Sequence, residues 1–151
     1  MPFNLLKLSE DNGIQIEVYD FKSPIEALYK AIPGYPPVIG LSKTLLKSTS
    51  HLRSVWAHEL GHHFTSGKST IRKTFLHYRD RLECNRDEHR AWRWAANYLV
   101  PEDTLLRAIG NGIIEMWRLA EFFEVDINLI SIRLKLLGLR GNFNAKCINR
   151  S

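Results

Sequence analysis

Hydrophobic and polar positions alternate near the start of the chain in a pattern that predicts a small sheet. Ile14, Ile16 and Val18 are each followed by a polar residue or tyrosine, which is the period of a strand with one buried face. A second apolar run at 38–41 follows a break rich in Pro and Gly and predicts another strand. Two short helices are expected around these strands, at residues 3–10 and 23–30.

Helical spacing dominates the rest of the chain. Leu52, Val55, Trp56 and Leu60 recur every three or four residues and predict a helix over about 50–65, with hydroxyl side chains to cap its start. Residues 66–70 are small or polar and are expected to form a loop. Further helices are expected at about 80–101, at 102–109, and as a pair within 119–137. The predicted fold class is α+β and mainly helical.

The composition fits one compact domain. The 151 residues are 44% hydrophobic and 25% charged, which is enough for a sizeable core. No apolar run reaches the length of a membrane span and the N-terminus lacks the basic start of a signal peptide, so a cytoplasmic protein without a membrane partner is expected. Cys84 and Cys147 form no Cys-x-x-Cys pair and are expected to be free thiols. The net charge of +5 is modest and does not require a nucleic-acid partner.

The segment 57–63 contains the pattern His-Glu-x-x-His, whose spacing has a direct chemical meaning. On a helix, His58 and His62 lie one turn apart on one face, so both imidazoles can reach the same metal ion. Glu59 is offset from His58 by about 100° around the axis, which suits a base rather than a ligand. A structural zinc normally has four Cys or His ligands, whereas two His and a carboxylate leave one position open for water. The pattern therefore favours a catalytic metal over a helix that exposes two histidines by chance.

A third metal ligand must come from further along the chain. The long metzincin pattern is excluded, because Thr65 and Lys68 occupy the positions that it reserves for Gly and His. The alternative is a carboxylate on the next helix, where Glu88 shares a helical stripe with Ala91, Trp92, Ala95 and Leu99. The small alanines would let this helix approach the histidine helix closely. Four other side chains compete for the role: His77, Glu83, Asp87 and His89.

A group that stabilises an oxyanion is a further requirement of many zinc peptidases. His77 and Tyr78 follow the expected loop, and either side chain could serve. Both could equally be surface or packing residues, so the sequence leaves this role unassigned.

At these residues the sequence resembles the ImmA/IrrE family of metallo-endopeptidases. The family pairs a His-Glu-x-x-His helix with Glu-x-x-Ala-x-x-aromatic-Ala-Ala, closing on an apolar run and Pro, as residues 88–101 do here. The resemblance implies zinc held by His58, His62 and Glu88, and manganese is kept as an alternative metal. It also implies Glu59 as the catalytic carboxylate. Trp94 and Tyr98 depart from the family pattern, at positions that affect packing and not the metal.

The C-terminal third supports a different interpretation, a DNA-binding helix-turn-helix. Residues 119–125 and 127–137 have the rhythm of two helices, with Asp126 expected to cap the second. Apolar residues cover much of that second helix, so it is expected to pack rather than to lie in a groove. The family has a similar segment, often with Gly where Glu124 stands here. The basic residues available for phosphate contact are Arg133, Lys135, Arg140, Lys146 and Arg150.

Together these features predict a single metallopeptidase domain over 1–151. It would comprise a zincin-like core at 1–112, with a small N-terminal sheet, and a helix-turn-helix-like tail at 113–140 packed on the core. The expected function is a zinc-dependent endopeptidase that hydrolyses a peptide bond in a specific protein partner. The resemblance implies that the partner is a helix-turn-helix transcriptional repressor, in a phage, another mobile element or a stress response. The alternative is a transcriptional regulator that binds DNA or protein and has a vestigial or structural metal site.

Overall fold

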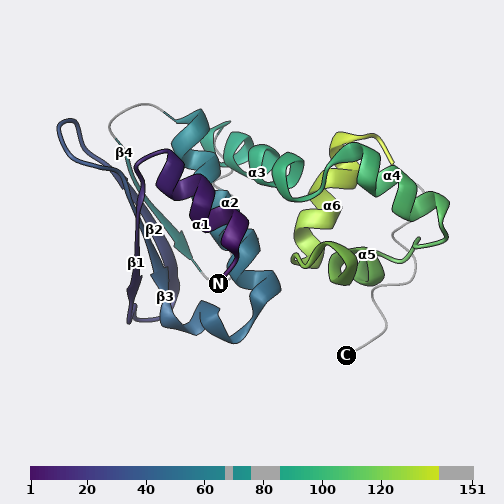
Figure 1. The fold of residues 1–151 in the computed structure, drawn as a ribbon, viewed down its shortest axis with the longest axis horizontal. Helices are drawn as coiled ribbons and strands as arrows, with labels where there is room; N and C mark the ends of the chain where they lie inside the picture. Colours follow the sequence, from purple (N-terminus) through teal and green to yellow (C-terminus); the bar gives the residue numbers. More distant parts are fainter. Residues whose placement is uncertain (67–69, 76–85, 140–151) are drawn as a thin grey trace.

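The computed structural model describes residues 1–66, 70–75 and 86–139, and for 70–75 it describes the backbone only. Figure 1 shows a sheet at one end of the molecule with α1 (Phe3–Asp11) and α2 (Thr49–Thr65) beside it. Helix α3 (Arg86–Leu99) leads from α2 towards the helices at the other end. Several residues considered above lie outside the described ones: His77, Tyr78, Glu83, Cys84 and Cys147.

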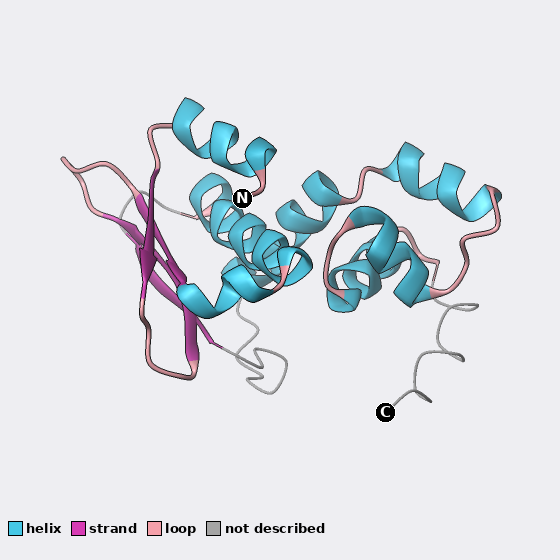
Figure 2. Ribbon diagram, turned by 60° about the horizontal axis from the view of Figure 1, so that its bottom comes forward, coloured by secondary structure: helices cyan, strands magenta, loops and turns pink. Residues whose placement is uncertain are grey.

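Four strands form a mixed sheet in the order β1-β3-β2-β4. They are β1 (Gln15–Tyr19), β2 (Ile25–Ala31), β3 (Val38–Ser42) and β4 (Thr70–Phe75). Strand β1 pairs in parallel with β3, whereas β2 pairs antiparallel with both β3 and β4. The strands predicted at 14–19 and 38–41 are confirmed, but the buried face expected for the first is not, since Val18 is exposed and Ile16 is only half-buried. The described helices lie on one side of the sheet (Figure 2).

The prediction of a helix at 23–30 is wrong, because most of this segment forms strand β2. Its Glu-Ala-Leu start suits a helix, but hydrogen-bonding partners on both sides, β3 and β4, impose the extended conformation. The strand period is visible in Ala27, Tyr29 and Ala31, which are buried while Lys30 is exposed. Strand β4 was not predicted from the sequence either, since the loop expected at 66–70 gives way to a strand from Thr70.

Helix α2 is the central element of the core. The expected cap is present, since the Ser48 hydroxyl accepts a hydrogen bond from the His51 amide at 3.3 Å. Leu52, Val55, Trp56 and Leu60 are buried as predicted, together with most of the rest of the helix. A helix buried on nearly all sides must have polar side chains that find partners or ligands inside the protein. Its two motif histidines are therefore in an environment that demands such a partner.

The remaining helices follow the predicted order. They are the short 3-10 helix η1 (Lys43–Lys47), α4 (Glu102–Gly110), α5 (Met116–Phe123) and α6 (Ile127–Leu136). Buried apolar residues form one cluster that runs from Leu5 to Leu134, while the division of the chain at residue 112 stays a prediction. Among the described helices, none is long and apolar enough to cross a membrane.

The turn between α5 and α6 differs from expectation at its cap. Glu124 ends α5 in the left-handed conformation, with φ 51°, which is why a Gly suits this position. Asp126 stands at the N-cap position of α6, but its carboxylate makes no capping hydrogen bond. Asp126 is therefore the N-cap residue that the sequence predicted, but its carboxylate lies 2.6 Å from His51 Nδ1 instead of bonding to the first turn of α6.

Helix α6 packs on the core, as its apolar pattern predicted. Arg133 is 7% exposed and lies within this interface. Its guanidinium donates to the carbonyl oxygen of Val100 at 2.8 Å and to Asn97 Oδ1 at 2.7 Å. A buried guanidinium that already has these acceptors is not available to a phosphate, which removes one of the five basic residues proposed for DNA contact.

Candidate metal centre

The two motif histidines lie on the buried face of α2 and point to the same place. His58 is 1% exposed and His62 0% exposed. The His58 ring stacks on the indole of Trp92 from α3, with centroids 4.0 Å apart and planes 17° from parallel. This contact fixes the plane of the imidazole, so the direction of its Nε2 lone pair is set by packing.

Glu88 completes a group of three side chains. It lies in the first turn of α3, where its Oε2 is 2.9 Å from His58 Nε2 and its Oε1 is 2.9 Å from His62 Nε2. The three potential ligand atoms lie within 4.8 Å of one another. Among the other candidates within the described residues, Asp87 pairs with Arg90 at 3.6 Å and His89 is exposed. The structure therefore brings together the three residues that the sequence singled out, while their role as ligands stays a prediction.

Gly61 allows α3 to come this close. A Cβ at this position would lie 2.3 Å from the carbonyl oxygen of Ala91, well inside any normal contact. The glycine inside the His-Glu-x-x-His motif and the alanine three residues after Glu88 are thus in direct backbone contact. Their small size sets the helix separation that brings Glu88 to the histidines.

Electrostatics at this centre favour positive charge. Burial acts to lower the pKa of His58, but the carboxylates of Glu59 and Glu88 outweigh it and raise the pKa to about 9. Burial acts to raise the pKa of Glu88, but the two imidazoles beside it hold that pKa well below its usual range. The carboxylates therefore stabilise a cation at this position, and a proton or a divalent metal ion would satisfy them.

The donor set fits a divalent metal ion. Two imidazole nitrogens and one carboxylate are a common ligand set for catalytic zinc. Among the described residues, neither ring nitrogen of His62 has a hydrogen-bond partner, and its 2.9 Å contact with Glu88 lacks hydrogen-bond geometry. A buried imidazole without a hydrogen bond is costly unless its lone pair is given to a ligand.

Glu59 lies beside this group without joining it. It is fully buried, and its Oε1 is 3.4 Å from His58 Nδ1, the nitrogen that faces away from Glu88. The sequence expectation that Glu59 is offset from the ligand face is confirmed by this placement.

Two residues next to Glu59 were not singled out from the sequence. Tyr29 projects from β2, and its hydroxyl is 3.0 Å from His63 Nδ1. Burial raises the pKa of Tyr29, and the nearby charge of Glu59 raises it further. Burial lowers the pKa of His63. The pair joins residues 34 positions apart, so no local pattern could have identified it.

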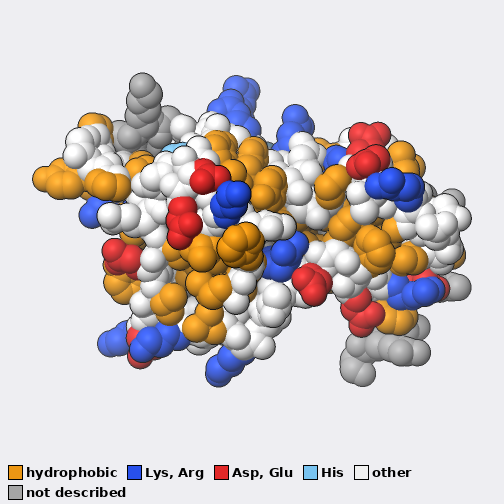
Figure 3. Space-filling view, viewed as in Figure 1, with side chains coloured by type: hydrophobic (Ala, Val, Ile, Leu, Met, Phe, Trp, Pro, Cys, Tyr) orange, Lys and Arg blue, Asp and Glu red, His pale blue; other side chains and the backbone are white. Residues whose placement is uncertain are grey.

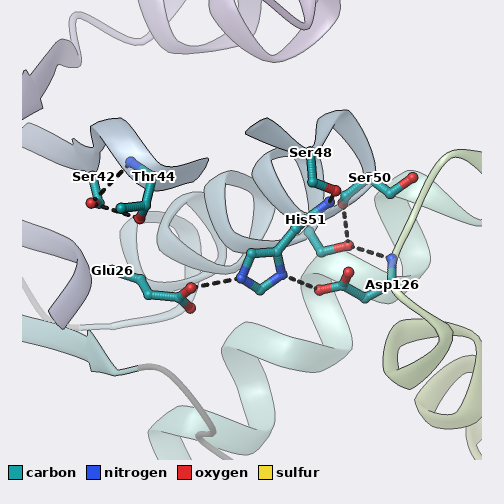
Figure 4. A network of polar contacts seen from close by, with 8 residues as sticks. Glu26, Ser42, Thr44, Ser48, Ser50, His51 and Asp126 are labelled. Carbon is teal, nitrogen blue, oxygen red and sulfur yellow. Dashed lines mark hydrogen bonds and ion pairs between the residues drawn. The ribbon is translucent and has the colours of Figure 1, made fainter. Parts of the chain in front are cut away.

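A second histidine cluster lies at the start of α2. His51 Nε2 is 2.8 Å from Glu26 Oε1 on β2, and His51 Nδ1 is 2.6 Å from Asp126 Oδ2 (Figure 4). The Ser54 hydroxyl accepts from the Asp126 amide at 2.8 Å, so the turn before α6 is held on both sides. Hydrogen bonds to Asp126 and then to Glu26 raise the pKa of His51 to about 10, against the opposing effect of burial.

A buried histidine pair with a glutamate from a neighbouring helix, beside a small sheet, defines the class of metallopeptidase-like proteins. The profile of the IrrE N-terminal-like domain, a peptidase family, matches residues 9–135, and the chain belongs to that family. The match covers both the His-Glu-x-x-His helix and α3, and it confirms the resemblance drawn from the sequence. No curated protein matches the chain.

Proposed function

We propose that this protein is a metal-dependent endopeptidase whose metal is held by His58, His62 and Glu88. The observation that carries the proposal is the convergence of their three ligand atoms within 4.8 Å, with the carboxylate of Glu59 buried beside them. Two-histidine, one-carboxylate sets leave a coordination position open for chemistry, unlike closed structural sites. The family to which the chain belongs includes peptidases by description, which agrees with this assignment.

The proposed metal is zinc, and the same nitrogen and oxygen donors would also accept manganese. When bound, the ion would supply Lewis-acid polarisation of the scissile carbonyl and of the attacking water. Trp92 would hold the His58 ring in plane for this purpose, and the contact between Gly61 and Ala91 would hold Glu88 at the right separation.

Glu59 is proposed as the general base. Its carboxylate would take a proton from the attacking water and then deliver that proton to the leaving amine. Its complete burial beside the three converging side chains favours this role, because a general base must lie within reach of the proton that it removes. His58 lies between Glu59 and Glu88, so the base and the ligand act on one small volume.

The proposed substrate is a protein, and by resemblance to the ImmA/IrrE family it is a helix-turn-helix transcriptional repressor. The rival function, DNA binding by α5 and α6, has less support. Arg133 is buried, and on the face seen in Figure 3 Lys and Arg side chains are scattered over the molecule rather than gathered over these helices. A DNA-binding surface needs a concentrated basic patch.

The test is cleavage of a proteome-derived peptide library in the presence of zinc or manganese, with new termini identified by mass spectrometry. Wild-type protein should produce cleavage that a chelator blocks. Glu59→Gln should lower kcat by about 10²–10⁴-fold while the bound metal is retained, because only the proton acceptor is lost.

The genes beside this one should be searched for a helix-turn-helix repressor, and the same preparation should be incubated with any such product, for which discrete fragments are expected. An intact repressor and an uncut library, together with promoter binding that weakens steeply with salt and is lost in Lys135→Ala, would establish the regulator instead.

A further inference from the structure

Tyr29 and His63 form a hydrogen-bonded pair that none of the roles above uses. Tyr29 is 3% exposed, and its hydroxyl lies 3.0 Å from His63 Nδ1, with the two rings edge to face at 6.0 Å. His63 is half-buried, so part of its ring faces an accessible region. Because the Tyr29 phenol is fixed by burial, its hydrogen bond holds the partly accessible His63 ring in one orientation.

The pair lies next to the proposed base. His63 follows Glu59 by four residues on α2, so the two side chains are neighbours one turn apart on the same helix face. Tyr29 comes from the facing strand β2 and is close enough to Glu59 for that charge to act on its hydroxyl. The three side chains thus occupy the side of the centre that faces the sheet.

The tautomer of His63 depends on which partner donates in this hydrogen bond. The Tyr29 hydroxyl has one proton to give, and His63 Nδ1 is the hydrogen-bond partner that the structure records for it. When Nδ1 accepts, the ring proton of the neutral imidazole resides on Nε2. In this tautomer, His63 presents an N–H donor from the ring edge that points away from Tyr29.

We infer that His63 Nε2–H donates a hydrogen bond to the scissile carbonyl oxygen as it becomes an oxyanion, and that Tyr29 is the positioning residue that sets this tautomer. The inference rests on the proposed peptidase function and adds the oxyanion donor to it. A donor held in advance costs no reorganisation when the charge develops, which is the main requirement of such a group.

The proposed step needs no further reactant. The water oxygen forms a bond to the carbonyl carbon, and the electron pair of the carbonyl π bond moves to the carbonyl oxygen. The water proton goes to Glu59, while His63 keeps its own proton and shares it in a hydrogen bond. Collapse of the oxyanion breaks the C–N bond, and Glu59 returns the proton to the leaving amine.

The kinetic test uses the best-cleaved peptide from the library and full-length, metal-loaded protein. His63→Phe should lower kcat by about 10²–10³-fold, with little change in KM, because a donor that acts on the developing charge has been removed. His63→Gln, whose amide can donate from nearly the same position as Nε2, should recover about 10-fold of that loss. A wild-type kcat for His63→Phe, or equal losses in both variants, would overturn the inference.

Tyr29→Phe removes a single oxygen atom and should lower kcat by about 10-fold, as expected for a partner that orients a functional imidazole. Tyr35→Phe is the matched control, because Tyr35 is 74% exposed and should keep wild-type kinetics. Metal content measured after dialysis should be the same in all of these variants.

A measurement that needs neither metal nor substrate tests the tautomer directly. Two-bond proton–nitrogen correlation spectra of ¹⁵N-histidine-labelled protein should show His63 protonated on Nε2, and Tyr29→Phe should shift the ring toward a mixture of tautomers. A proton on Nδ1 in the wild type would overturn the inference even if cleavage is found. A wild-type protein that shows the expected tautomer but cuts no peptide would remove the proposed function, and with it the catalytic role of His63.

Discussion

Helix α2 carries a histidine–carboxylate cluster near each end, and the two use the same chemical groups in different arrangements. At the start of the helix, His51 lies between the carboxylates of Glu26 and Asp126, at 2.8 and 2.6 Å. Towards its end, His58 and His62 share the carboxylate of Glu88, at 2.9 Å each. Distances and residue types alone do not separate these two sites.

Direction separates them. The two nitrogens of His51 lie on opposite edges of its ring, and each contacts a different carboxylate (Figure 4). The two carboxylates are therefore held apart, and each ring nitrogen already has a partner. At the other cluster, ligand atoms from three side chains converge within 4.8 Å. A metal ion needs lone pairs that converge on one point, whereas a structural ion pair needs donors and acceptors that alternate. The first cluster is accordingly a clamp between β2, α2 and α6, and the second a candidate ligand set.

The largest expected difference between the two clusters is in metal binding, and it is tested by removing one carboxylate from each. Glu88→Ala should weaken zinc binding by about 100-fold or more, since the site loses its anionic ligand and keeps two imidazoles. Asp126→Ala should retain the metal, although it also deletes a carboxylate bound to a histidine. Elemental analysis after dialysis against a weak chelator measures both.

Asp87→Ala is the closest control for this experiment, because it removes a carboxylate from the same helical turn as Glu88. Equal metal retention by Glu88→Ala and Asp87→Ala would move the metal away from the three converging residues.

The two clusters also differ in how far the sequence could predict them. His58, Glu59 and His62 lie within five residues, so helix geometry alone places them correctly. Glu88 required a second helix, and the small residues on its stripe indicated the close approach that Gly61 and Ala91 make.

The clamp could not be predicted in this way. His51 meets partners 25 and 75 positions away in the sequence, and Asp126 gave a strong local signal for a different role, a helix cap. Strand β2 was mistaken for a helix for a related reason: its pairing with β3 and β4 is non-local and overrides its local preference. The sequence therefore predicts chemistry concentrated in one helix better than contacts between distant segments.

Gly61→Ala tests whether the close approach of α2 and α3 is needed for the metal centre. The added Cβ would meet backbone atoms of Ala91 at 2.3–2.8 Å, which a side-chain rotation cannot relieve. We expect a loss of about 2–3 kcal/mol in the free energy of unfolding, in the range for overpacking of a core, measured by urea denaturation. Gly110→Ala is the control, since a Cβ there meets nothing within 4 Å. Metal affinity should fall in Gly61→Ala alone, and wild-type stability of this variant would contradict the tight α2–α3 contact.

The smallest expected effect lies at the clamp and depends on pH. The pKa of His51 is raised from 6.5 to about 10 in the folded protein, so the folded state binds the proton more tightly than the unfolded chain does. Its contribution is therefore fully present below pH 6.5 and is lost as the pH rises through about 10. We expect His51→Gln to lower the free energy of unfolding by about 1–2 kcal/mol at neutral pH, less than the full shift implies, because the ring is partly exposed and screened. Urea denaturation at several pH values should show wild type and variant converging towards pH 10, and a constant difference would mean that His51 acts through packing rather than charge.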